Sequence, residues 1–374
     1  FRRPTIVCWG PMTRRNIKFG VHIFGSPSAA IKRELQSVYE TDRDAKVIVY
    51  TNSKLNAEGT LTNIAQSIID SIAELTGVAI ALTGDCGIMM KTFLMAAFCG
   101  KTDDQVAEED MELPNVLILP ATASANCGFS SIFCKRATRY SIPPNLIDIA
   151  QEMGRVDRTH DDAARGEHRY DLYISFHCVM NLFLRVFQGA TAAIREFEFS
   201  ELFAVLHFVV LPTKCYHVFL EEHFERPSAN ADRNNCGDNC SFCTSEHLSF
   251  TKQFVREELV EVLKDCIFDL GPVTLAAFLK GLTSNVDDIY GQDEALVKSL
   301  QPGNVHALAL QLVAARFVEI FVDEAHSTKL GTKDLNKNHL KVKLVKNEAG
   351  RRFRINNEGD WDHHGFNYRR STIT

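Results

Sequence analysis

The sequence contains no run of the ~18–20 consecutive apolar residues that a membrane-spanning helix needs. Its first residues, FRRPTIVCWG, also lack the apolar core of a secretory signal. Of its 374 residues, 45% are hydrophobic and 24% are charged, which is typical of a globular protein and unlike a disordered one. We therefore expect an intracellular protein without a membrane-spanning segment, long enough for two or three domains.

The phosphate-cradling loop of ATPases, Gly-x-x-x-x-Gly-Lys-Ser/Thr, is also absent. The stretch GIMMKT at 87–92 has no glycine before its lysine. DEAH at 323–326 spells an acidic ATPase motif, but no phosphate loop precedes it, so we interpret it as a chance match. By itself, the chain is not expected to hydrolyse ATP at a useful rate.

Most of the 11 cysteines stand singly in apolar surroundings, where a small buried thiol is the simplest interpretation. Three form a C-x3-C-x2-C cluster with turn residues between them, and in an intracellular chain this spacing favours a metal over disulfides. A fourth ligand, Cys215 or else His217 or His223, would complete a structural zinc site. Without a metal, the cluster would be a set of reduced thiols. Its members are Cys236, Cys240 and Cys243.

The formal net charge of −6 weighs against a nucleic-acid partner, but the charge is unevenly spread. Between residues 329 and 354, nine Lys or Arg stand against two acids, a local charge of +7 that leaves −13 for the rest. Within it, HLKVKLVK alternates apolar and basic residues, which predicts a strand with one basic face. We expect this face to contact the DNA backbone, with edge protection as the alternative. Its lysines are Lys341, Lys343 and Lys346.

The first half of the chain alternates strand and helix patterns. AKVIVY at 45–50 is an apolar run, apolar residues at helical spacing follow from 61 to 75, and GVAIALT is a second apolar run. A helix through MMKTFLMAAF, a strand NVLIL at 115–119, a helix LIDIAQEM capped by Asn145 and a strand DLYISF continue the pattern. This order predicts an α/β domain with a parallel sheet over residues 1–188, with ligands at the carboxyl ends of the strands.

The second half has a different texture. Residues 189–248 predict a helical region that ends in the cysteine cluster, and 249–315 predict three amphipathic helices. Strands in VEIFV and HLKVKLVK follow, and three helices before a hairpin is the order of a winged helix, so we expect such a domain over 249–354. Residues 355–374 show no periodicity and predict a flexible tail. The third helix would place on one face Val305, Leu308, Leu312 and Ala315.

The stretch QEMGRVDRTH at 151–160 places Arg155 and Arg158 three residues apart, on one face of a predicted helix. A guanidinium group suits phosphate oxygens, and in phosphoryl transfer an arginine can be worth ~10³–10⁵ in rate. The alternative is a solvated pair that bridges Glu152 or Asp157.

QEMGRVDR resembles the sixth helicase motif of the RecQ family of ATP-dependent DNA helicases. RRNIKFGV at 14–21 resembles the segment that opens the second motor lobe of that family, KVIVYTNSK at 46–54 resembles motif IV, and ATASANCGF at 121–129 resembles motif V. These segments keep the family's order over residues 12–345. The resemblance implies a RecA-like parallel sheet lobe, then a helical zinc-binding subdomain and a winged-helix domain.

The resemblance also implies roles for matching residues. Arg158 would be the arginine finger that reaches the γ-phosphate, Arg155 would support the same site, and Gln151 would help to couple the two lobes. ATP and Mg²⁺ would bind only together with a first motor lobe, which this sequence lacks. Asp157 departs from the family's glycine, and NCGF departs from its usual motif V loop. The expected contacts to the DNA backbone are Thr122, Asn126 and Gly128.

We therefore expect the C-terminal part of a 3′-to-5′ DNA helicase of RecQ type that acts on single strands and junctions in DNA repair and recombination. It would be nuclear in a eukaryote and cytoplasmic otherwise. The alternative is a non-catalytic or degenerate DNA-binding adaptor that retains the zinc and winged-helix modules, which Asp157 favours. A lobe of an RNA helicase is a third interpretation, disfavoured by the cysteine cluster.

Overall fold

The computed structural model describes most of the first 244 residues and a few short segments beyond them. No helix in this described part is long and apolar enough to cross a bilayer. The described residues are 14–52, 59, 61–71, 78–99, 115–122, 134–156, 168–188, 192–212, 214–224, 236–244, 267–269, 310, 313–314, 318–322 and 340–344.

Six parallel strands form the main sheet, in the order β1-β6-β5-β2-β4-β3. Strands β2 and β4 are buried at every residue, as expected for apolar runs in a parallel sheet that is covered on both faces. The expected α/β class is confirmed. The strands are β1 (Lys18–Ile23), β2 (Lys46–Tyr50), β3 (Val78–Ala79), β4 (Val116–Ala121), β5 (Cys134–Tyr140) and β6 (Arg169–Ile174).

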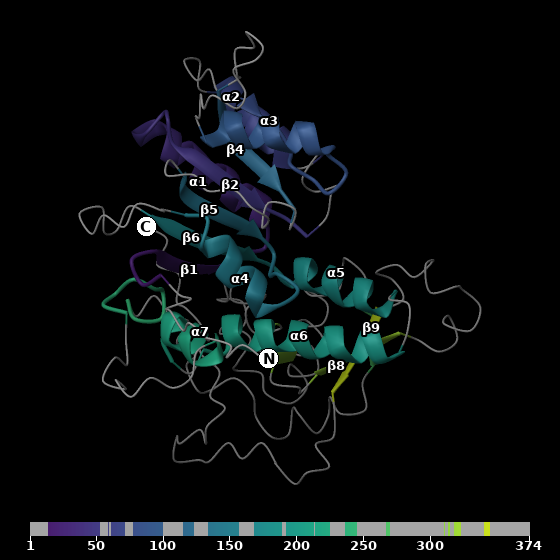
Figure 1. The fold of residues 1–374 in the computed structure, drawn as a ribbon. Coiled ribbons are helices and arrows are strands. Elements are labelled where there is room, and N and C mark those ends of the chain that lie inside the picture. The colour runs from purple at the N-terminus through teal and green to yellow at the C-terminus, as the bar shows by residue number, and fades with distance from the viewer. Residues whose placement is uncertain are drawn as a thin grey trace, which may run out of the picture.

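Helices cover both faces of this sheet (Figure 1). Alternate residues of β2 join different core clusters: Val47 and Val49 pack with α1 and α2, whereas Ile48 and Tyr50 pack with α3, α4 and α5. Because successive side chains of a strand point to opposite faces, these two helix groups lie on opposite sides. The helices are α1 (Pro27–Thr41), α2 (Thr62–Ser71), α3 (Ile88–Cys99), α4 (Leu146–Met153) and α5 (Phe176–Phe187).

Helix α4 begins where its sequence predicts. The side chain of Asn145 accepts a hydrogen bond from the amide of Asp148 at 2.9 Å, which satisfies one amide of the first turn. The side chains of Leu146, Ile149 and Met153 are buried, as their helical spacing requires. Strands β1 and β5 and helices α1 and α5 were not predicted from the sequence.

Two further helices confirm the predicted helical region, α6 (Ala192–Val210) and α7 (Tyr216–Phe224). Helix α6 packs against α4 and α5 and runs along the base of the lobe (Figure 1). The side chains of Leu202, Val205 and Leu206 in α6 and of Leu220 in α7 belong to the same core cluster as α5. The helical region is therefore continuous with the core of the lobe.

A second, antiparallel sheet has the order β7-β9-β8, with β7 (Ile267–Asp269), β8 (Val318–Val322) and β9 (Leu340–Leu344). The hairpin of VEIFV and HLKVKLVK is thus confirmed. The first predicted amphipathic helix is wrong at its end, because residues 267–269 form strand β7. The alternative that the basic strand protects a sheet edge is also wrong, because β9 is the central strand of this sheet.

The remaining predicted winged-helix residues lie outside the described part, apart from Leu310, Val313 and Ala314. These three side chains are buried in the main core cluster. The face expected for the third helix, from Val305 to Ala315, is not among the described residues, and neither is the predicted tail over 355–374.

A buried carboxylate ties β1 to β6. Burial alone would raise the pKa of Asp171, but hydrogen bonds from His22 and Arg169 hold this pKa well below its usual range. The carboxylate lies against the Cα of Gly20, where an added Cβ would come within 2.1 Å of Asp171 Oδ1. A side chain at position 20 would therefore displace a charged group that has no other place in the core.

The variant Gly20→Ala tests this close approach. We expect it to lower the free energy of unfolding by about 1–3 kcal/mol, because the methyl group displaces Asp171 from its partners. Gly84→Ala is the matched control, since an added Cβ there meets nothing within 4 Å, and it should stay within about 0.5 kcal/mol of the wild type. Chemical denaturation measures both, and equal stabilities would contradict the assignment.

Candidate functional site

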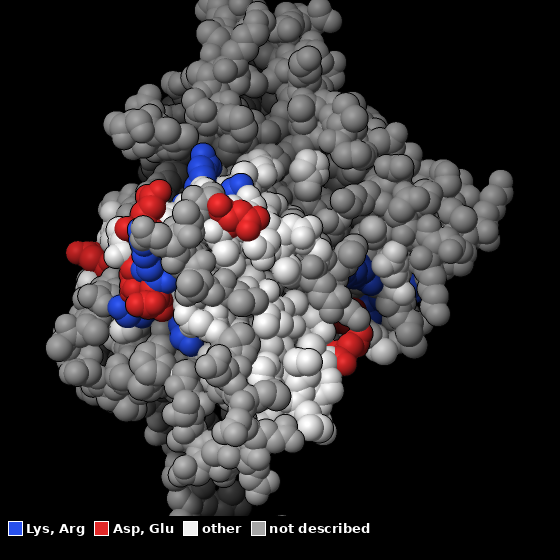
Figure 2. Space-filling model, turned by 90° about the horizontal axis from the view of Figure 1, so that it is seen from above, with Lys and Arg blue, Asp and Glu red and all other residues white. Residues whose placement is uncertain are grey.

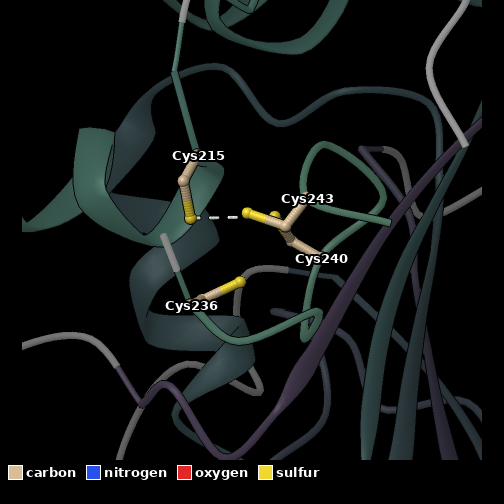
Figure 3. Close-up of side chains that lie close together, drawn as sticks. All are labelled: Cys215, Cys236, Cys240 and Cys243. Atoms are coloured by element: carbon tan, nitrogen blue, oxygen red, sulfur yellow. Dashed lines mark hydrogen bonds between the residues drawn. The ribbon is translucent and has the colours of Figure 1, made fainter. Parts of the chain in front are cut away.

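Four cysteine side chains converge between the start of α7 and a loop of residues 236–244, which we call the cysteine loop (Figure 3). Their sulfur atoms all lie within 4.8 Å of one another, and the Sγ atoms of Cys215 and Cys240 are 3.7 Å apart. Four sulfurs bound tetrahedrally to zinc at about 2.3 Å would be about 3.8 Å apart, whereas a disulfide requires about 2.05 Å. The residues therefore fit a tetrahedral metal site. The other two sulfur atoms of the cluster belong to Cys236 and Cys243.

Geometry also selects the fourth ligand, which the sequence left open. His217 is buried and its Nε2 atom lies 3.0 Å from the carbonyl oxygen of Ile17. The ring of His223 stacks on that of Phe219, 6.3 Å between centroids. Cys215 thus completes the group of four, as first expected.

Local backbone geometry shapes the cysteine loop. Gly237 and Asp238 both adopt positive φ, 65° and 66°, so the chain can reverse between Cys236 and Cys240. An added Cβ at Gly237 would meet nothing within 4 Å, so the glycine serves the backbone conformation rather than a lack of space. Asp tolerates the left-handed region better than most residues. This tight turn brings two thiols to the same point.

One thiol of the cluster is prepared for ionisation. Hydrogen bonds from the thiols of Cys236 and Cys240 lower the pKa of Cys215, and the backbone amide of Val218 in the first turn of α7 acts in the same direction. A thiolate at a helix N-terminus is a known way to stabilise this charge. The hydrogen bonds to Cys215, together with burial, raise the pKa of Cys236 and of Cys240, so without a metal only one of these three thiols favours the thiolate form.

A second group of candidate residues lies at the carboxyl ends of the central strands. Asn52 follows β2 and Thr122 follows β4, and both are half-buried. The amide of Thr122 donates to the carbonyl of Leu82 at 3.2 Å, which fixes the chain as it leaves β4. Asn126 and Gly128 lie outside the described residues, so their expected DNA contacts stay predictions.

The arginine motif differs from its expected geometry. Helix α4 ends at Met153, and only a turn follows, in which the amide of Arg155 donates to the carbonyl of Glu152 at 3.1 Å. Arg155 is buried, with 8% of its surface exposed, whereas Gln151 is exposed. The expectation that Arg155 projects from a regular helical face is therefore wrong. Arg158 and Asp157 lie outside the described residues.

Beside this turn lies a buried polar network. The carboxylate of Glu152 is fully buried, pairs with Arg139 and accepts a hydrogen bond from the hydroxyl of Tyr170 at 2.7 Å. Arg139 also donates to the side-chain oxygen of Asn52, and the backbone carbonyl of Asn52 accepts from Arg185 at 2.6 Å. A solvated ion pair is thereby excluded for Glu152. The network was missed because its members are far apart in the sequence.

Burial raises the pKa of Glu152 to about 7, although the charge of Arg139 and the hydrogen bond from Tyr170 oppose the shift. A raised pKa of an acid means that the folded state favours the neutral form. The contribution of Glu152 to stability is therefore fully present below its unfolded pKa of 4.5 and is lost as the pH rises through about 7.

The basic strand is only partly described. Lys341 and Lys343 lie in β9, and Lys346 is outside the described residues. In the strand register, Lys343 stands opposite Glu319 of β8 and Lys341 opposite Asp269 of β7. Figure 2 shows acidic and basic side chains intermixed on the described part of one face, with no large patch of one sign there.

The segment GIMMKT lies at the beginning of α3, with Gly87 directly before the helix. Lys91 lies within this helix, and its ammonium group donates to the carbonyl of Gly84 at 3.1 Å. The side chains of Ile88 and Met89 are 84% and 87% exposed.

No protein-family model and no curated protein matches the chain. Among solved structures, it is similar to the Mycobacterium smegmatis helicase Lhr bound to ssDNA and AMP-PNP, with 15% identity over 46% of this chain and 21% of that one, at a TM-score of 0.31. It is also similar to domain 2 of the DEAD-box helicase Mss116p bound to an RNA duplex, with 13% identity over 55% and 75% of the two chains, at a TM-score of 0.32.

A further similarity is to the helicase domain of Pyrococcus furiosus Hef, with 15% identity over 40% of this chain and 26% of that one, at a TM-score of 0.26. The chain thus spans about a fifth of the length of Lhr and about a quarter of that of Hef. These TM-scores are all below 0.5, so the α/β assignment rests on the sheet itself.

The variant Glu152→Gln tests the buried carboxyl group. In the wild type, we expect the free energy of unfolding to fall by about 3 kcal/mol between pH 4.5 and 7 on account of this group, and the variant should lack that slope. Glu196→Gln, at an exposed position of α6, is the matched control and should keep it. Denaturation at a series of pH values provides the measurement, and parallel curves for wild type and Glu152→Gln would refute the shift.

Metal content tests the cysteine cluster. We expect the purified chain to carry about one zinc ion and Cys240→Ser to carry almost none, because one of four ligands is lost. Cys86→Ser removes a half-buried thiol outside the cluster and should leave the zinc in place. Elemental analysis by mass spectrometry gives the stoichiometry. A wild type without metal, or equal loss in both variants, would rule out this site.

Proposed function

We propose that the chain is the C-terminal part of an ATP-dependent DNA helicase of RecQ type, translocating 3′ to 5′. Its lobe would supply Arg158 and Arg155 to an ATP site completed by a first motor lobe. Zinc held by the four cysteines would be structural, because all four ligand positions of a tetrahedral site are occupied by protein thiolates.

The observation that carries this proposal is the placement of the three motif-like segments. Strand β2 pairs with β4 on one side and with β5 on the other. The segment like motif IV begins with β2 and continues past it, the segment like motif V begins at the last residue of β4, and the segment like motif VI begins in the last turn of α4. Glu152 in that turn pairs with Arg139 near the end of β5, and Arg139 donates to the side chain of Asn52 after β2, so stretches that are distant in sequence meet near the carboxyl ends of adjacent strands. Parallel α/β sheets bind ligands at this edge.

The C-terminal sheet supports a winged helix in the same proposal. Strands β8 and β9 form a hairpin, and the earlier strand β7 pairs with β9 on its other side. A short strand placed before the last helices and a hairpin after them is the strand arrangement of a winged helix. In the proposed role, this domain would contact the DNA backbone through Lys341, Lys343 and Lys346, together with Thr122, Asn126 and Gly128 of the lobe.

One observation favours a second candidate, a non-catalytic DNA-binding adaptor. Arg155 is buried in its own lobe rather than presented to a nucleotide on a partner lobe. In an adaptor, the arginines would be structural, and the cysteine cluster and the C-terminal sheet would serve binding alone.

ATP turnover in a protein that joins a nucleotide-binding lobe to this chain distinguishes the two. We expect DNA-stimulated hydrolysis that falls by about 10³-fold or more in Arg158→Ala, because an arginine finger stabilises the charge of the transferring phosphoryl group. Arg195→Ala, on α6, is the control and should remain near the wild-type rate. The chain without that lobe should show no useful turnover. Equal rates for wild type and Arg158→Ala would favour the adaptor.

A further inference from the structure

Residues 15–21, the first four residues of β1 and the three before them, contact both halves of the cysteine cluster. From α7, the imidazole of His217 lies 3.0 Å from the carbonyl oxygen of Ile17, and Glu221 pairs with Arg15 through both carboxylate oxygens. Helix α7 begins directly after Cys215, so these contacts fix the position of the first thiol.

The cysteine loop is bound to the same residues. The side chain of Asn239 donates to the carbonyl of Arg15 at 2.8 Å. The amide of Phe19 donates to the carbonyl of Asn239 at 2.9 Å, and the amide of Ser241 donates back to the carbonyl of Phe19 at 2.9 Å. Phe19 and Cys240 thereby form a parallel bridge, so the loop extends the main sheet beyond its edge strand.

Most of these contacts are buried, whereas the pair of Arg15 and Glu221 is about one-quarter exposed, at 24% and 22% of the two side chains. Ile17, Phe19, Cys240 and His217 are all 0% exposed. The ring of Phe19 lies 4.9 Å from that of Tyr216, next to Cys215. In a site from which water is excluded, hydrogen bonds are electrostatically stronger and unmade ones are costly.

The two halves of the cluster are separated in sequence by residues 225–235, yet one strand holds both. A flexible pair of ligand segments would lose conformational freedom each time a metal bound. Because β1 holds both segments in the folded protein, this conformational entropy is lost on folding and not on metal binding. The thiols are therefore already within 4.8 Å of one another.

We propose that residues 15–21 are the template of the metal centre, and that His217, Glu221 and Asn239 are positioning residues that set its metal affinity without touching the metal. The inference rests on the metal centre of the proposed function and adds to it the strand that assembles the site. By linkage, metal binding stabilises the pairing of β1 with the cysteine loop to the same extent.

Neighbouring glutamates on α7 provide a matched test in the full chain. Glu221 pairs with Arg15 of the template, whereas Glu222 pairs with Lys214 within the helical region. We expect Glu221→Gln to bind zinc about 10–100-fold more weakly than the wild type and Glu222→Gln to bind it equally well. Competition with a chromogenic zinc chelator gives the affinities. Equal affinities for the two variants would overturn the template.

A second pair of variants checks the histidine. His217→Ala should weaken zinc binding, and His217→Gln should restore part of it, because the glutamine amide can still donate to the carbonyl of Ile17. Both should retain the intense sulfur-to-cobalt absorption of a four-thiolate site when Co²⁺ replaces zinc, since no ligand is removed. Loss of that spectrum in His217→Gln would make His217 a ligand and refute the positioning role.

Hydrogen exchange at the template provides a readout that does not depend on any variant. Addition of zinc should slow exchange of the amides of Phe19 and Ser241, which bridge the strand and the loop. Unchanged exchange on zinc binding would overturn the template while leaving the metal centre intact. A wild-type chain that binds neither zinc nor cobalt would instead remove the metal centre, and the template with it.

Discussion

Strand β1 forms hydrogen bonds along both of its sides, and this double pairing is the constraint on which the described structure depends. On one side it pairs with β6 over six residues, and on the other the cysteine loop bonds to both backbone groups of Phe19. An uncovered strand edge is a template for unwanted pairing. The cysteine loop covers this edge. The helical region and the lobe share one hydrophobic core, to which Phe19, Cys215 and Cys240 all belong.

The lobe also buries carboxylates, and it does so with partners from several elements. Asp171 joins β6 to β1, and Glu152 joins α4 to β5 and β6. Removing one partner of a buried ion pair costs about 3–5 kcal/mol, so the pairing of Asp171 strongly disfavours a shifted register, and Glu152 adds hydrogen bonds from Arg139 and Tyr170. The apolar contacts of the core would tolerate small shifts better. Polar groups thus define the arrangement of strands that the apolar residues stabilise.

The sequence predicts those elements whose signal is local. The apolar runs of β2 and β4 and the Asn145 cap of α4 are visible in a few consecutive residues. Strand β5 was missed because CKRATRY carries three basic residues, and all three pair with distant acids: Lys135 with Asp42, Arg136 with Glu34 and Arg139 with Glu152. The spacing of the cysteines predicted the cluster of thiols, but not the contacts of β1 with it, because the bond between Val21 and Ser241 spans 220 residues.

The order of strands also determines how the metal centre relates to the carboxyl edge of β2, β4 and β5. Strands β1 and β6 lie between the cysteine loop and β5, the nearest strand of that edge, which separates the two sites by about 14 Å at about 4.8 Å per strand. Zinc there would be too distant to touch a nucleotide or a base at that edge. Contacts between the sites are nevertheless continuous: Phe19 packs on Tyr170, 5.6 Å between ring centroids, and Tyr170 donates to Glu152 in the helix that precedes Arg155. A metal held by the four cysteines would therefore be linked to the arginine motif through the strands that position it.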